Sequence, residues 1–82
     1  MQPTTEQLRQ QWGAAVAQHR KDRKLSQRGL ARLAGIGQDT VSAIEKGEHG
    51  GSDLTRIALA RAFGVEVHEL FAYPPIVEAA AS

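Results

Sequence analysis

Apolar side chains recur roughly every three or four residues along most of the chain, which is the spacing of amphipathic helices. Glycine, serine and proline residues interrupt this pattern, and no segment alternates with a two-residue period for long enough to form a strand. The pattern predicts helices over residues 5–22, 27–34, 38–46 and 53–63, followed by one or two turns around residues 67–71. We therefore expect an all-α fold, a compact five-helix domain with short connections.

Candidate cap residues support these helix starts. Thr4 and Gln7 have the spacing of a capping box, in which each side chain bonds to the backbone of the other residue. Ser26 is the candidate cap of the second helix, and either Ser52 or Asp53 is the candidate cap of the fourth.

Three features of the sequence predict how the helices pack. Gly13 lies inside the first helix, where glycine costs about 1 kcal/mol relative to alanine, so we expect it to lie against a neighbouring element. We also expect Trp12 in the core, and Leu30, Leu33 and Ala34 on the inner face of the second helix.

Composition excludes several classes of protein. The chain has no cysteine, which excludes a disulfide scaffold, a thiolate zinc site and a cysteine nucleophile. His19, His49 and His68 fall in different elements, no serine has an assignable base, and residues 35–37 lack the strand and third glycine of a dinucleotide site. We expect no metal, no cofactor and no enzymatic activity. With no apolar run of about 20 residues and no secretory signal pattern, we expect a soluble cytoplasmic protein.

Positive charge is concentrated in one part of the chain, although the net charge is only +1. Between residues 20 and 32, Asp22 is the one acidic residue beside the cations Arg20, Lys21, Arg23, Lys24, Arg28 and Arg32. From residue 64 onwards the chain has no lysine or arginine. The basic segment can attract a polyanion, but a solvated charged face explains the same pattern equally well.

Residues 25–47 carry the most informative pattern, two short helices joined by a tight turn. Gly35 supplies the positive φ that the turn needs, and Ile36 is the apolar residue that fills the angle between the helices. This is the layout of a helix-turn-helix, whose second helix enters the major groove of DNA.

The predicted helix over residues 38–46 has two unlike sides. Val41, Ile44 and Glu45 gather on one of them. The other side carries Gln38, Asp39, Ser42, Ala43 and Lys46. Glutamine can bond an adenine edge in bidentate fashion, aspartate can accept from cytosine, and alanine can touch a thymine methyl. The second side therefore suits close approach to base edges.

The sequence resembles the lambda-repressor-like, Cro/CI-type (XRE) helix-turn-helix family of DNA-binding transcriptional regulators. The resemblance covers about Trp12 to Phe71. The matching positions are Gly13, Arg20, Leu25-Ser26-Gln27, Leu30-Ala31, Gly35, Thr40-Val41-Ser42, Ile44-Glu45, Gly47, Ala60, Phe63-Gly64-Val65 and Leu70.

The resemblance implies roles for individual residues. Gln38 would read a base, and Gln27 would touch a phosphate and brace Gln38. Further base-reading positions are Asp39, Ser42 and Ala43, and positions at the DNA backbone or groove wall are Thr40 and Lys46. Arg20 and Glu45 match a buried salt bridge between the family's first and third helices. Arg28, on the second helix, is either solvated or phosphate-facing.

The sequence also departs from the family pattern. Gly29 removes the capping box of the second helix, and Gly37 replaces the usual serine or threonine cap of the recognition helix. Asp39 brings negative charge close to DNA. The loop over residues 48–51 lacks the family's frequent basic residues and proline, so phosphate contacts there would have to come from backbone N–H groups. We therefore expect modest affinity per subunit and a need for a dimer.

The C-terminal end carries more apolar side chains than a free end needs, which indicates a dimer interface. The candidate interface residues are Leu70, Phe71, Tyr73, Ile76 and Val77. We divide the chain into a helix-turn-helix domain over residues 1–73 and a tail over residues 74–82 that takes part in the interface. In the alternative, Leu70 and Phe71 complete the core of the monomer.

These features together predict sequence-specific binding to double-stranded DNA and transcriptional regulation of repressor or controller type. Helix 38–46 would enter the major groove, and a homodimer would bind a palindromic operator. The alternative is a protein-interaction module with the same fold, for example an antitoxin that binds a toxin partner. The exposed side of helix 38–46 favours DNA, because a protein interface is expected to carry aromatic or large apolar anchors.

Overall fold

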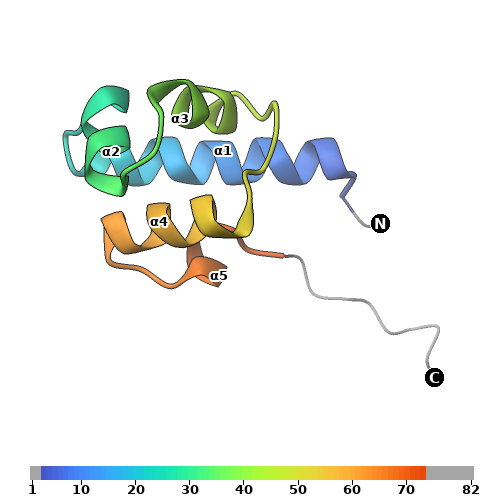
Figure 1. Cartoon of the computed structure of the whole chain (residues 1–82). Helices are drawn as coiled ribbons and strands as arrows, with labels where there is room; N and C mark the ends of the chain where they lie inside the picture. Colours follow the sequence, from blue (N-terminus) through green and yellow to red (C-terminus); the bar gives the residue numbers. More distant parts are fainter. Residues whose placement is uncertain (1–2, 74–82) are drawn as a thin grey trace.

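Helix α1 (Thr5–Asp22) lies in the middle of the domain and packs against three other helices. Figure 1 shows α3 (Gln38–Glu45) on one side of α1, with α4 (Asp53–Phe63) and α5 (Val67–Leu70) on the other, and α2 (Gln27–Ala34) overlaps the C-terminal end of α1 in this view. Contacts between α2 and α3, α2 and α4, and α4 and α5 complete the arrangement. The helix-turn-helix pair therefore rests on a support made by α1 and α4.

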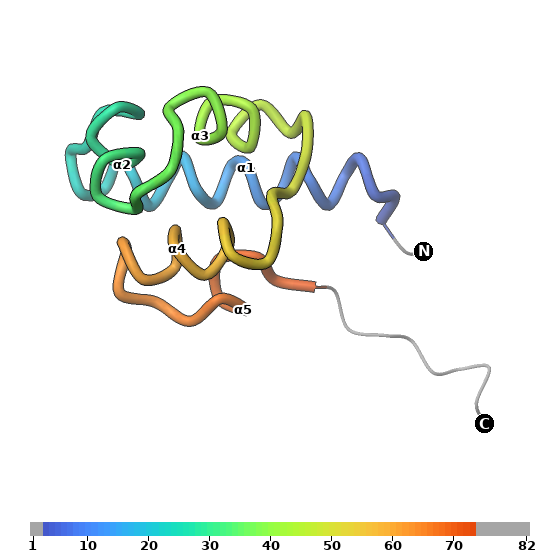
Figure 2. Tube along the Cα trace, in the orientation of Figure 1, coloured from blue at the N-terminus to red at the C-terminus, as the bar shows by residue number. Residues whose placement is uncertain are grey.

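The computed structural model describes residues 3–73, and in this range it has five helices and no strand. The tube in Figure 2 shows how short the connections between successive helices are. This confirms the all-α, five-helix prediction. No helix in the described range is long and apolar enough to cross a membrane. Ile76 and Val77, and the tail over residues 74–82 assigned to the dimer interface, lie outside the described residues.

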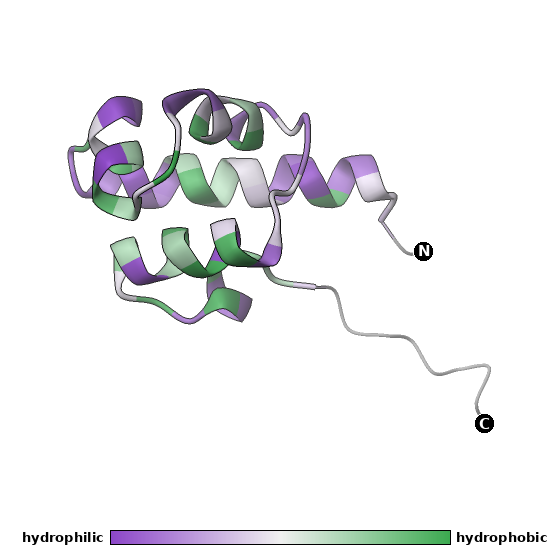
Figure 3. Cartoon of the chain, viewed as in Figure 1, coloured by the Kyte–Doolittle hydropathy of each residue, from purple (hydrophilic) through white to green (hydrophobic). Residues whose placement is uncertain are grey.

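The core lies where the helices meet around α1. Its largest fully buried side chains are Phe71, Leu30, Ile44, Leu59, Leu70, Val16 and Val41. Trp12 is 6% exposed, as predicted, and contacts Phe71 edge to face with ring centroids 5.9 Å apart. Figure 3 shows that the first turns of α1, which extend beyond the other helices, are mostly hydrophilic.

The predicted caps are present. The hydroxyl of Thr4 accepts a hydrogen bond from the amide of Gln7, and the side chain of Gln7 accepts one from the amide of Thr4. Ser26 and Ser52 each accept a bond from the third residue of the helix that they precede. Asp53 is the first residue of α4, so Ser52 is its cap.

The prediction for the inner face of α2 is wrong at one residue. Leu33 is 59% exposed, whereas Leu30 and Ala31 are buried and Ala34 packs against the core. At about 100° per residue, the centre of the buried arc lies between Leu30 and Ala31, close to Ala34. Leu33 falls about 100° away from that centre, so its side chain points to solvent.

The assignment of Leu70 and Phe71 to a dimer interface is also wrong. Each is 1% exposed and belongs to the core of the monomer. Helix α5 has a single turn, and its contacts with α1 and α4 take up these two side chains. Tyr73 is 64% exposed and remains available to a partner.

Gly13 lies where α1 passes closest to α3, as its position in the sequence predicted. A Cβ atom on this residue would collide with the carbonyl oxygen of Ile44 and would lie 2.8 Å from the carbonyl oxygen of Glu45. Both oxygens belong to the backbone of α3 and cannot swing away. Glycine at this position therefore allows the two helices to approach each other.

We expect Gly13→Ala to lower the free energy of unfolding by about 3 kcal/mol, because the helices must separate to admit the methyl group. Gly29→Ala is a matched control on α2, since its Cβ would lie no closer than 3.2 Å to a neighbouring atom, the Ser26 hydroxyl oxygen. We expect the control to change stability by less than about 1 kcal/mol. Urea denaturation measures both variants, and equal losses would contradict the close approach of α1 and α3.

Candidate nucleic-acid interface

Helix α3 turns the predicted base-reading side towards solvent. Val41 and Ile44 are fully buried, and the side chain of Glu45 is 7% exposed. The residues on the opposite side are exposed or half-buried, namely Gln38, Asp39, Thr40, Ser42, Ala43 and Lys46. The helix ends at Glu45, one residue earlier than predicted, and Lys46 is its C-cap. The division of this helix into an inner and an outer side agrees with the helical wheel.

The turn between α2 and α3 has the geometry that its glycine predicts. Gly35 adopts a left-handed conformation with φ 72°, and its amide donates to the carbonyl of Arg32. The amide of Ile36 donates to the carbonyl of Ala31, and the side chain of Ile36 packs against the core. Gly37 precedes α3, and no side chain caps that helix. The placement of α3 therefore depends on its packing and on the ion pair behind it.

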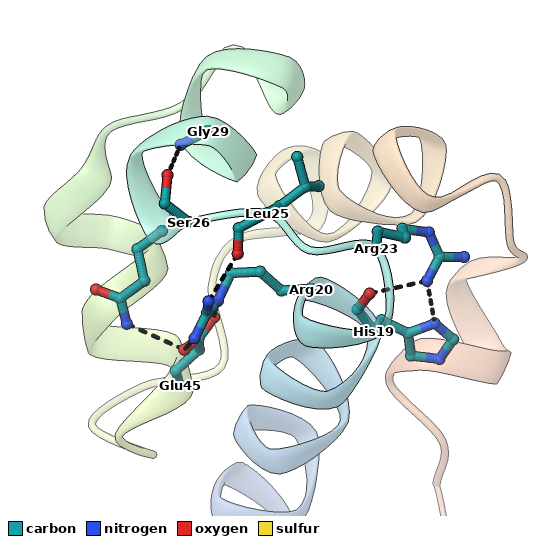
Figure 4. Close-up of polar contacts among 8 residues, drawn as sticks. His19, Arg20, Arg23, Leu25, Ser26, Gly29 and Glu45 are labelled. Carbon is teal, nitrogen blue, oxygen red and sulfur yellow. Dashed lines mark hydrogen bonds and ion pairs between the residues drawn. The ribbon is translucent and has the colours of Figure 1, made fainter.

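An ion pair between Arg20 and Glu45 holds α3 against α1 (Figure 4). Arg20 Nε donates to Glu45 Oε2 at 2.7 Å, and Arg20 Nη2 donates to Glu45 Oε1 at 3.0 Å. Arg20 Nη1 donates to the carbonyl of Leu25 at 2.9 Å, and this bond also ties the segment between α1 and α2 to the ion pair. The two side chains are 14% and 7% exposed. The predicted pair is thus present, partly buried and bidentate.

Gln27 has a partner that the sequence comparison did not suggest. Its Nε2 donates to Glu45 Oε1 at 3.0 Å, and among residues 3–73 it makes no hydrogen bond to Gln38. A carboxylate is a stronger acceptor than a carboxamide, so the charged Glu45 draws the Gln27 side chain to the end of α3. In this structure Gln27 braces the recognition helix at Glu45 and does not brace the Gln38 side chain.

The hydrogen bonds that Arg20 donates to Glu45 raise the pKa of Arg20 above its ordinary value, and the opposite charge of Glu45 adds to this effect while burial opposes it. A group whose pKa is raised by folding stabilises the fold below its unfolded pKa and loses that contribution as the pH passes its folded pKa. For arginine this window is strongly alkaline. The positive side of the pair therefore stays charged at every pH near neutrality.

The cations of the basic segment fall into two groups, those that bond to other groups of the fold and those that are exposed without such bonds among residues 3–73. Arg20 serves the ion pair, and Arg23 is also engaged: its Nη2 donates to the carbonyl of Phe63 at 2.8 Å and its Nη1 donates to the carbonyl of His19 at 2.9 Å (Figure 4). Its guanidinium lies 4.8 Å from the centre of the Phe63 ring. Arg23 is exposed but already bonded, and the exposed cations of the segment without such bonds among the described residues are Lys21, Lys24, Arg28 and Arg32. Fewer charges can therefore meet a polyanion than the sequence count suggested.

The loop over residues 47–51 continues directly from α3. The amide of Glu48 donates to the last turn of α3, and the amide of Gly51 donates to His49 Nδ1 at 3.0 Å. The amides of His49 and Gly50 have no partner among the described residues. Only part of the loop backbone is therefore free to contact a phosphate.

One residue beside this loop was missed by sequence reasoning. Arg56, in α4, donates from Nε to the carbonyl of Gly50 at 2.8 Å and lies 4.6 Å from the centre of the Trp12 ring. It stands outside the basic segment and matches no family motif, so neither signal in the sequence identified it.

The chain is similar in sequence to known helix-turn-helix regulators. A helix-turn-helix family model matches residues 16–70. An uncharacterised HTH-type transcriptional regulator of Methanocaldococcus jannaschii is 37% identical over 49 residues, which cover 60% of this chain and 74% of the relative. Another such regulator, from Methanothermobacter thermautotrophicus, is 35% identical over 57 residues, which cover 68% of this chain and 83% of the relative.

Two solved structures are similar to the whole arrangement of helices. The restriction-modification controller protein C.AhdI from Aeromonas hydrophila has a TM-score of 0.72 and 31% identity, with 76% of this chain and 94% of that chain covered. The hypothetical transcription factor NHTF from Neisseria has a TM-score of 0.76 and 27% identity, with 90% and 85% covered.

We expect Glu45→Ala to lower the free energy of unfolding by about 3 kcal/mol, because it leaves the partly buried Arg20 charge without its partner. Glu48→Ala is the matched control. Glu48 is exposed, lies three residues away and has no side-chain bond among the described residues, so we expect a change within about 0.5 kcal/mol. Urea denaturation at neutral pH measures both. Indistinguishable stabilities would show that the pair does not hold α3 in place.

Proposed function

Because the chain belongs to the Cro/CI-type helix-turn-helix family of DNA-binding transcriptional regulators, we propose that it binds a specific double-stranded DNA sequence with α3 in the major groove. We further propose that it acts in the cytoplasm as a homodimer on a palindromic operator, as a regulator of repressor or controller type. The observation that carries the proposal is the outer side of α3, whose small and hydrogen-bonding side chains face solvent while the inner side is fixed.

Base reading rests on the first two turns of α3. Gln38 and Asp39 are exposed in the first turn, and Ser42 and Ala43 lie one turn further along the same side. Gln38 can bond both edge atoms of an adenine, and Asp39 can accept from the amino group of a cytosine. The small side chains of Ser42 and Ala43 let the helix approach the floor of the groove.

Contacts between the inner side of α3 and the rest of the domain hold the base-reading side chains in position, which makes the readout specific. Arg20 and Gln27 both bond to Glu45, at the end of α3, while Val41 and Ile44 pack into the core. Binding groups discriminate between bases only when their positions are held within a fraction of an ångström. The outer side chains therefore project from a helix whose rotation and position are both fixed.

Phosphate contacts position the domain without reading sequence. Arg28, exposed on α2, and Lys46, exposed at the end of α3, are the cations that we assign to this task. Thr40 adds a hydroxyl at the side of the helix. Because Asp39 opposes the DNA charge, affinity from a single domain is modest, which favours a dimer.

The surface for the second copy differs from the predicted one, since Leu70 and Phe71 are buried. An open cleft of about 430 Å³ is lined by Asp53, Arg56, Ile57, Val67, His68, Phe71 and Tyr73. Large apolar side chains near this cleft are exposed. On α4, Leu54 is 79% and Ile57 is 38% exposed, and beyond α5 Tyr73 is 64% exposed. We propose that a second copy covers this face. A two-fold arrangement would place the same cleft of each copy against the other.

The same face also lies on the side of α1 away from the proposed DNA contact. Figure 1 shows α4 and α5 across α1 from α3, so two copies can meet there without blocking the recognition helices. An exposed apolar area of this kind on a small domain is typical of an interface.

Replacing Gln38 with alanine should lower affinity for the best operator by about 1–3 kcal/mol and relax the preference at one base pair, because a bidentate base contact is lost. The operator is first identified by selection from random duplexes, and affinities are then measured by gel shift on that operator and on its single-base variants.

Arg28→Gln is the comparison for Gln38→Ala. If Arg28 meets a phosphate, this variant weakens binding to all duplexes about equally and lowers the salt slope by about one. An unchanged base preference in Gln38→Ala would refute the assignment of Gln38 as a base reader. Absence of any DNA binding by the wild-type chain would favour the protein-interaction alternative.

We expect the wild-type chain to sediment as a dimer at micromolar concentration and Ile57→Asp to shift it to the monomer. A charge at the wall of the cleft would have to be buried without a partner on association. Leu33→Asp is the control, because Leu33 is a large apolar residue on α2 that is 59% exposed and does not line the cleft. A monomeric wild type, or a dimer that survives Ile57→Asp but not Leu33→Asp, would overturn this placement of the interface.

A further inference from the structure

Arg56 connects the loop that follows the recognition helix to the C-terminal end of the described chain. Its Nε donates to the carbonyl of Gly50 at 2.8 Å, and its Nη1 donates to the hydroxyl of Tyr73 at 2.9 Å. Its guanidinium lies 4.6 Å from the centre of the Trp12 ring and 5.5 Å from that of Phe71. One planar group therefore contacts the loop, the core and the exposed cleft face at once.

The loop packs closely against this group. A Cβ atom on Gly50 would lie 2.7 Å from Arg56 Nη2 and 2.9 Å from Trp12 Cζ3, so no side chain fits there without displacing one of them. Trp12 is itself fixed, because its Nε1 donates to the carbonyl of Ala72 at 2.7 Å. The Tyr73 ring packs on Trp12 edge to face, with centroids 5.3 Å apart. The position of Gly50 thus depends on a rigid cluster of one arginine and its aromatic neighbours.

The segment held in this way presents hydrogen-bond donors next to α3. His49 is exposed, and its Nδ1 accepts from the amide of Gly51, so the neutral ring carries its proton on Nε2. The amide of His49 has no partner among the described residues. Two donors, one from the ring and one from the backbone, therefore lie in the loop that follows α3, and Figure 1 shows this loop leaving α3 before it reaches α4.

We propose that Arg56 is a positioning residue for DNA binding: it holds the loop over residues 48–51 in the conformation in which the donors of His49 meet a phosphate, and Tyr73 holds Arg56. This inference rests on the proposed function, because it names what sets one phosphate contact of the same interface. Arg56 itself does not contact the phosphate, since two of its nitrogens bond to the protein and its faces are directed at aromatic rings.

Arginine suits this position in a way that lysine does not. The guanidinium is planar and donates in fixed directions, so one side chain can bond to Gly50 and Tyr73 and still stack on Trp12. A lysine ammonium carries the same charge but offers neither the fork nor the flat face. Arg56→Lys therefore removes the positioning and keeps the charge.

The test compares Arg56→Lys with Arg61→Lys, a matched control on the same helix whose arginine is exposed. Fluorescence anisotropy gives affinities for the selected operator and for a random duplex over a range of salt concentrations. We expect Arg56→Lys to bind both duplexes about tenfold more weakly, with unchanged base preference and an unchanged salt slope. The control should match the wild type. A salt slope lowered by about one in Arg56→Lys would instead indicate that Arg56 contacts a phosphate directly, and would overturn the positioning role.

A second variant guards against a folding defect in the first. Tyr73→Phe removes one hydroxyl and keeps the ring, and we expect it to cause a smaller, uniform loss of affinity of about threefold. Nitrogen–proton correlation spectra of the free proteins should show shifted amide signals for Gly50 and Gly51 in both variants and not in Arg61→Lys. Sedimentation of each variant separates these effects from a change in self-association.

The outcomes separate the two proposals. Equal DNA affinities and equal loop signals in Arg56→Lys and Arg61→Lys, with a wild type that binds DNA, would overturn the role of Arg56 alone. A wild type that binds no duplex would overturn the proposed function, and this inference with it.

Discussion

The bidentate pair between Arg20 and Glu45 is the interaction on which the orientation of α3 depends. Helix α3 has eight residues and no side-chain cap, so it would not be stable as an isolated segment. Burial of Val41 and Ile44 attaches it to the core, but apolar contact has no direction and leaves the rotation of the helix loosely defined. Two parallel N–H···O bonds from one guanidinium define it, because they require the carboxylate in one orientation. The apolar contacts thus attach α3 to the core, and the ion pair sets its orientation.

Features that depend on near neighbours in the chain were predictable from the sequence. The Thr4 and Ser26 caps, and the left-handed Gly35, follow from contacts within a few residues, so local spacing identifies them. The Arg20–Glu45 pair spans 25 residues and was found only through resemblance to a family. Gly13 was predictable as a close approach, since an unfavourable residue in a helix needs a reason, but its partner in α3 was not.

The parts that sequence reasoning missed depend on which elements folding brings together. Phe71 and Tyr73 look alike near the C-terminus, yet α5 buries the first and leaves the second 64% exposed. No pattern of spacing separates the two, because both rings contact Trp12, about sixty residues earlier, and the difference in burial depends on how α5 packs against α1 and α4. The same holds for Arg56, whose partners Gly50 and Tyr73 lie on opposite sides of it in the chain. Helical periodicity describes the faces of one element and cannot say what lies opposite.

Three arginines of the chain are taken up by contacts within the fold. Arg20, Arg23 and Arg56 are engaged with Glu45, with backbone carbonyls or with aromatic rings, so their charges serve the fold. Each phosphate that a protein neutralises adds about one unit to the salt slope, and affinity rises with the number of such contacts. Six further lysines and arginines are exposed among residues 3–73, while Asp39 places a negative charge on the outer side of α3. In the proposed dimer, two copies joined away from α3 would double the phosphate contacts and the base contacts together, without adding a charge to either recognition helix. Arg20 bonds to α3 and Arg56 bonds to the loop that follows it, so in the proposed dimer affinity would come from the number of domains, while specificity would come from the rigidity of each.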